Sequence, residues 1–136
     1  MALKALENLV KIGTLQAEAG TAAEVDGLLT AGARRLTDAE NSALSLESRF
    51  DLAYNAAHSL ALAALRFHGY RSKNRYTVFQ VLPHTLKVSN SHWRVVDQAH
   101  AKRNLAEYDG TFDVDVALVE AVIRVARELE IGVRRL

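Results

Sequence analysis

A stripe of polar side chains marks the segment AHAKRNLAEYDG at residues 99–110. His100, Arg103, Asn104 and Glu107 have helical spacing and would share one face of a helix, and Tyr108 follows directly. A guanidinium presents forked donors to a phosphate or carboxylate, and an imidazole exchanges protons near neutral pH. The stripe is therefore either a site, a polar network in the core, or a solvated face with intrahelical ion pairs.

A second polar stripe crosses the most apolar segment of the chain, residues 45–70. Asp51, Asn55 and His58 lie four and three residues apart, so a helix would align them. Buried polar groups need partners, which an antiparallel helix carrying Arg103 and Asn104 would supply. We therefore expect the two stripes to meet, with Arg103 paired to Asp51. Asp97 is expected on the outer face.

Residues 71–76, RSKNRY, carry a basic patch in a segment expected to be a loop. Arg71, Lys73 and Arg75 alternate with polar residues and are flanked by Tyr70 and Tyr76. Such a patch is able to bind nucleic acid or phosphate, and it would extend the positive surface around Arg103 if the fold brings it close. The simpler interpretation is a solvated loop.

The chain offers little for a metal or a cofactor. Its five histidines have no metal-binding spacing, and it contains no cysteine. The sequences GxGxxG, GxxxxGK[ST] and GxSxG are absent. We expect neither a metal nor a cofactor.

Capping and breaking residues predict where the helices begin and end. Thr21 with Glu24 forms a capping box, Ser45 is an N-cap, Gly69 and Gly110 are stop signals, and Pro83 ends or kinks a short helix. Apolar periodicity between these signals predicts helices over residues 2–12, 21–39, 45–69, 77–86, 89–110 and from 113 or 115 onward.

These segments predict a single all-α domain over residues 1–136, built as a five- to six-helix up-and-down bundle. The formal net charge of +1 argues against general nucleic-acid binding by charge alone. No apolar run is long enough to span a membrane, and the chain is expected to be cytoplasmic. The apolar surface of segment 45–70 and of the last helix exceeds what one bundle readily covers, which predicts a homodimer.

The chain also resembles the HEPN superfamily over residues 46–132. The resemblance is carried by YNAAHSLALAALRFHGYR, by VFQVLPHTL, by RNLAEYDG and by the final apolar helix. It implies a HEPN-like helical domain and a motif that begins with Arg103 and Asn104. In HEPN ribonucleases a histidine follows, and Arg and His face each other across a dimer cleft. Here Glu107 or Tyr108 stands where that histidine is expected.

Three functions follow from these observations. The first is a HEPN-like binding or accessory module for a nucleotide, RNA or a partner protein, such as a nucleotidyltransferase in a toxin–antitoxin system. The second is a metal-independent endoribonuclease toxin that uses Arg103 with His100 or Tyr108. The third is a structural bundle without a ligand. The missing histidine favours binding over catalysis, because a histidine is the proton carrier that RNA cleavage needs.

Overall fold

The computed structural model describes residues 2–136. Its helices, seven in this part of the chain, confirm an all-α bundle, although α4 and α5 are only short. They are α1 (Ala2–Lys11), α2 (Ala22–Ala39), α3 (Leu46–Phe67), α4 (Arg75–Gln80), α5 (Leu82–Thr85), α6 (Asn90–Asp109) and α7 (Val116–Arg134). Two short antiparallel strands, β1 (Gln16–Ala17) and β2 (Tyr70–Arg71), were not expected.

The helix ends follow the capping signals in the sequence. Ser45, Ser89 and Asp115 are N-caps whose side chains accept backbone N–H groups of the first turn. Gly110 ends α6 in the left-handed conformation, with φ 73°. Thr21 caps α2 as expected, but the carboxylate of Glu24 bonds to arginines rather than completing a capping box.

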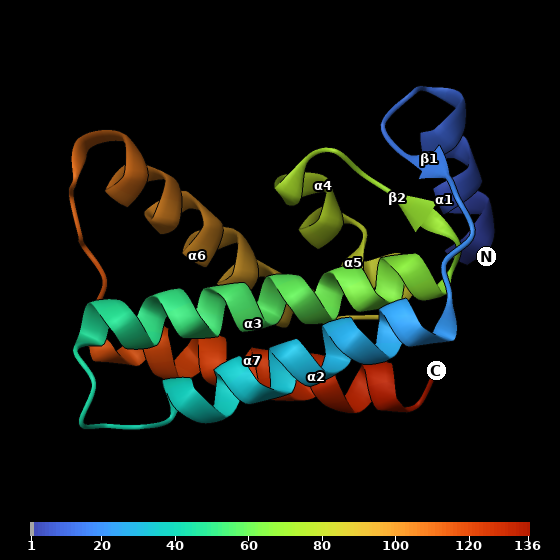
Figure 1. The fold of residues 1–136 in the computed structure, drawn as a ribbon. Helices are drawn as coiled ribbons and strands as arrows, with labels where there is room; N and C mark the ends of the chain where they lie inside the picture. Colours follow the sequence, from blue (N-terminus) through green and yellow to red (C-terminus); the bar gives the residue numbers. More distant parts are fainter. Residues whose placement is uncertain (1) are drawn as a thin grey trace.

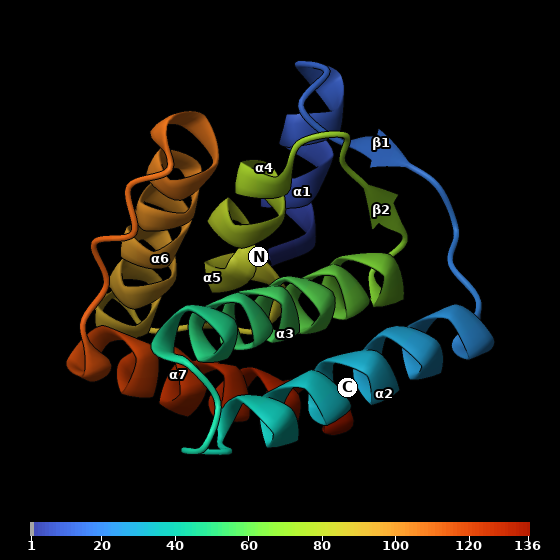
Figure 2. The same cartoon turned by 60° about the vertical axis from the view of Figure 1, so that its left-hand side comes forward.

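Helix α3 lies at the centre of the molecule. In both views α2 and α7 run beside it on one side, while α1, α4, α5 and α6 lie on the other (Figures 1 and 2). Helices α2 and α3 approach each other closely, because Gly32 of α2 has no side chain and lies directly against Leu60 of α3. On the other side α6 slopes away from α3 toward its own C-terminal end (Figure 1).

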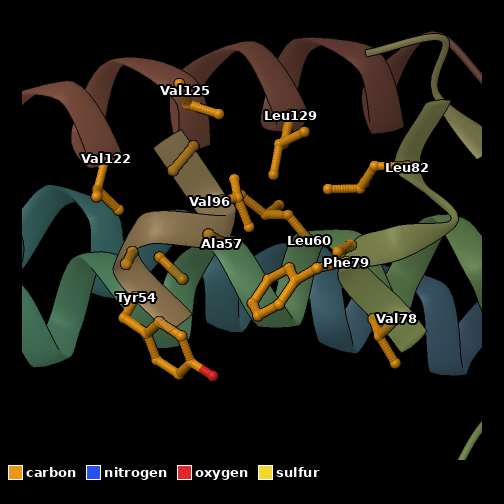
Figure 3. Close-up of a cluster of buried hydrophobic side chains, with 14 of the residues drawn as sticks. Tyr54, Ala57, Leu60, Val78, Phe79, Leu82, Val96, Val122, Val125 and Leu129 are labelled. Carbon is orange, nitrogen blue, oxygen red and sulfur yellow. The ribbon is translucent and has the colours of Figure 1, made fainter. Parts of the chain in front are cut away.

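The core is formed by aliphatic and aromatic side chains between these two layers (Figure 3). Leu60 of α3, Phe79 of α4, Val96 of α6 and Leu129 of α7 are all buried within it. Tyr54 lies at its edge with the hydroxyl directed away from the cluster (Figure 3). The core therefore ends where the polar stripe of α3 begins.

Burial within a single chain accounts for much of the apolar surface from which a homodimer was predicted, and the homodimer stays a prediction. Most residues of α3 are buried by α2, α4, α6 and α7, and one face of α7 is buried likewise. Large apolar side chains that stay exposed include Ile12, Phe67 and Val116. Within residues 2–136, no helix is long and apolar enough to cross a bilayer.

Candidate functional site

Polar side chains gather where α6 separates from α3, with α4 alongside. A hollow of about 340 Å³ opens there. It is lined by Asp51 and Asn55 of α3 and by Arg103, Ala106 and Glu107 of α6. The expectation that the two polar stripes meet is confirmed by this lining.

His100 is enclosed between aromatic rings at the inner end of the site. Its ring centroid lies 6.1 Å from that of Tyr54 and 5.2 Å from that of Tyr76. His100 Nδ1 is 2.9 Å from Tyr54 Oη, and Asn104 Nδ2 is 3.2 Å from Nε2. The amide N–H₂ of Asn104 only donates, so in neutral His100 Nε2 accepts and the Nδ1 proton is directed to Tyr54. Both ring nitrogens are therefore occupied.

The environment keeps the histidines of this site neutral. Burial, Arg75 and Arg103 lower the pKa of His58 from 6.5 to about 4. Burial and then Arg103 also lower the pKa of His100. His58 packs edge-on against Phe79, with ring centroids 5.6 Å apart. Neither imidazole adds positive charge to the hollow at neutral pH.

Arg103 lies over the ring of Tyr54, with Cζ 5.1 Å from the ring centroid. Its ion pair is with Glu107, at 2.7 Å, and not with Asp51 as expected. An i,i+4 carboxylate on the same helix reaches the guanidinium without bridging the hollow. Burial raises the pKa of Asp51, and the nearby charge of Arg103 partly opposes this. The Arg103 side chain remains 23% exposed, so it is accessible from the hollow.

Only one residue of the basic patch reaches this site. Arg75 Nη1 donates to Asn55 Oδ1 at 3.4 Å, and within residues 2–136 no carboxylate lies within 4.0 Å of its guanidinium. Arg71 is instead paired with Glu18 and Glu24. Lys73 lines a separate polar hollow with Ser72 and Asn74. Arg71 and Lys73 thus lie together at that separate hollow, with Arg71 neutralised by the two glutamates, and only Arg75 extends the positive surface around Arg103.

Two further residues differ in their surroundings from what the sequence suggested. Asp97, expected on the outer face, is half-buried, and its interaction with the Tyr76 hydroxyl is the main cause of the raised pKa of Tyr76. Tyr108 is 92% exposed, on the last turn of α6, where the helix has moved away from α3 (Figure 1). It lines no hollow with Arg103. A role of Tyr108 in orienting a ligand of Arg103 stays a prediction.

Sequence reasoning missed three residues that surround the site and one buried arginine at the far end of α3. Tyr54 and Tyr76 flank His100, and Asp97 contacts Tyr76. Spacing offered a signal for two of them, because Asp97 lies three residues before His100, and Tyr54 lies beside Asn55. The fourth, Arg66, is 2% exposed and bonds to Glu24 and to three backbone carbonyls, of Glu18, Ala19 and Tyr70.

A larger hollow lies at the opposite end of α3. It has about 550 Å³ and is lined by the N-terminal turn of α2 and the C-terminal ends of α3 and α7. Its cations, Arg66 and Arg134, are already paired with glutamates. Across residues 2–136, no three histidine, aspartate or glutamate side chains are grouped to hold a metal ion. The hollow beside Arg103 is therefore the stronger candidate site.

Comparisons with protein-family models, with curated proteins and with solved structures find no match to this chain. The assignment to the HEPN superfamily stays a prediction from the sequence motifs.

Proposed function

We propose that this protein binds RNA or a nucleotide between α3, α4 and α6 and does not turn it over. The observation that carries this proposal is the convergence of two arginines from different helices. Arg103 of α6 lies over the ring of Tyr54, with Cζ 5.1 Å from the ring centroid, and Arg75 of α4 donates to the neighbouring Asn55 Oδ1 at 3.4 Å. Both arginines oppose the rise in the pKa of Tyr54 that burial causes. Arg103 lines the hollow, and Arg75 donates to Asn55, which also lines it, so together they would offer forked donors to phosphate oxygens there.

The accessibility of Arg103 favours a site over a purely structural network. A structural network would enclose its arginine and satisfy it completely. Arg103 instead lines the hollow, and Arg75 has no carboxylate partner in the described residues. A bound phosphate would supply the missing counter-charge to Arg75.

The surroundings of His100 favour binding over cleavage. A proton carrier needs a free ring nitrogen within reach of the reacting group. Both nitrogens of His100 are engaged, by Tyr54 and Asn104, and Tyr108 lies outside the hollow. This arrangement of the two catalytic candidates supports binding over cleavage.

A titration of a short fluorescent single-stranded RNA by fluorescence anisotropy tests the proposal. We expect binding that weakens as salt rises, because phosphate contacts release counterions. Arg103→Ala and Arg75→Ala should each weaken binding about tenfold, the effect of losing one charged contact. The matched control is Arg94→Ala, which removes the same charge about two and a half turns earlier on α6, from an exposed residue on the opposite face.

Two results would reject this function. If Arg103→Ala lowers the melting temperature but leaves RNA affinity unchanged, the stripe is a structural network. If the protein cleaves RNA in the presence of a chelator and Arg103→Ala abolishes the cleavage, the chain is a metal-independent ribonuclease.

A further inference from the structure

The hollow beside Arg103 holds more negative charge than a phosphate site requires. Asp51 faces it from α3 and Glu107 faces it from α6, with Arg103 between the two in the same lining. The carboxylate of Glu107 is already bonded to Arg103 at 2.7 Å. A phosphate ion alone would be repelled by the remaining carboxylate. A ligand that fits must therefore bring hydrogen-bond donors as well as a phosphate.

Asp51 is the carboxylate with free acceptor capacity. Within residues 2–136, no cationic side chain lies within 4.0 Å of it. Asn55 Nδ2 donates a hydrogen bond to the backbone carbonyl of Asp51, at 2.8 Å, and not to its carboxylate. An ionised carboxylate only accepts, so the group that meets Asp51 must be an O–H or N–H donor.

Ribose hydroxyls match this requirement. They are attached to the same sugar as the phosphate, and a carboxylate is a common partner of the 2′-hydroxyl in nucleotide sites. The 2′-hydroxyl is also the group by which proteins distinguish RNA from DNA. A ribonucleotide is thus able to present its phosphate to Arg75 and Arg103 while its sugar faces the carboxylates.

We propose, as an extension of the proposed function, that Asp51 accepts a hydrogen bond from a ribose 2′-hydroxyl and thereby selects ribonucleotides over deoxyribonucleotides. Glu107 holds Arg103 in place and shares the polar lining. Asp51 is a specificity residue in this arrangement, whereas the two arginines supply most of the affinity.

The test compares RNA with DNA of the same sequence, with deoxyuridine in place of thymidine so that only the 2′-hydroxyl differs. The wild-type protein should bind the RNA about tenfold more tightly, the effect of one hydrogen bond to a charged group. In Asp51→Asn the ratio of the two affinities should fall close to one, chiefly through weaker RNA binding. Asp38→Asn, on an exposed position of α2, should preserve the wild-type ratio.

A second measurement needs no variant. RNA that carries 2′-O-methyl groups keeps the ribose pucker but lacks the donor, and the wild-type protein should bind it as weakly as DNA. Equal affinity for RNA and DNA, or an RNA preference that survives Asp51→Asn, would overturn the role of Asp51. Absence of binding to every one of these nucleic acids would instead remove the proposed function, and this inference with it.

Discussion

Tyr54 Oη and His100 Nδ1 lie 2.9 Å apart and join α3 to α6 at the point where the two helices begin to separate. The phenol is otherwise buried, at 1% exposure, with only its hydroxyl directed out of the core. The contact therefore fixes both the angle of α6 and the ring orientation of His100.

Replacing Tyr54 by Phe should remove this link and leave the packing of the ring in place. A lost hydrogen bond at a part-buried position costs about 1 kcal/mol of unfolding free energy. Urea denaturation of Tyr54→Phe measures it. Tyr108→Phe is the matched control, and at this exposed position we expect a change within about 0.5 kcal/mol. Equal stability of the two variants would show that the contact does not hold the helices together.

Two glycines of α2 should respond in opposite ways to alanine. A Cβ atom at Gly32 would lie 2.7 Å from Leu60 Cγ, whereas one at Gly27 would meet no atom within 4 Å. Gly32→Ala should therefore destabilise the fold by about 1–3 kcal/mol through overpacking against α3. Gly27→Ala should stabilise it by up to about 1 kcal/mol through helix propensity. Denaturant midpoints of the two variants on opposite sides of the wild type would confirm the contact between α2 and α3.

Arg66 should be essential for stability. It is 2% exposed and bonds to carboxylates and backbone carbonyls at the C-terminal end of α3. Arg66→Met keeps much of the volume but leaves these acceptors without a donor, at a cost of about 3–5 kcal/mol. Arg134→Met removes an exposed i,i+4 partner of Glu130 and should cost less than about 0.5 kcal/mol. Similar melting temperatures for the two variants would contradict a structural role for Arg66.

Acid should destabilise the fold through His58. Its pKa in the folded protein, about 4, lies below the ordinary value of 6.5. The unfolded chain therefore binds this proton first as the pH falls, and the stability present above pH 6.5 is lost toward pH 4. His58→Gln should reduce the slope of unfolding free energy against pH in this window. The lowered pKa of His100 makes stability depend on pH in the same direction, so part of the slope remains in His58→Gln. An unchanged slope in the variant would show that His58 is not held neutral.

Local signals in the sequence were sufficient to predict most of the helix ends. Ser45, Ser89 and Gly110 act through their own side chains or backbone, without reference to the rest of the fold. The strand pair was not predictable in this way. Gln16–Ala17 and Tyr70–Arg71 pair across a long sequence separation, and neither segment has a strand pattern of its own.

The candidate site was predictable in part. Helical spacing placed Asp51 and Asn55 on one face of α3. The need of such polar groups for partners then predicted that Arg103 of α6 lies beside them, as it does. Spacing does not predict which of two nearby carboxylates forms the ion pair with an arginine. Arg103 pairs with Glu107, one turn along its own helix, and not with Asp51. Spacing also does not predict that the C-terminal end of α6 lies away from α3, as Figure 1 shows. Tyr108, on the last turn of α6, is 92% exposed.

The central claim, that RNA binds between α3, α4 and α6, is tested most directly by locating the ligand on the protein. We suggest an NMR titration of isotope-labelled protein with single-stranded RNA, following the arginine Nε–Hε signals and the backbone amides. The account predicts the largest shifts at Arg75 and Arg103 and in the backbone around Asn55, with Arg94 and Arg124 unchanged. Shifts confined to the larger hollow between α2 and α7, or no shifts at all, would contradict it.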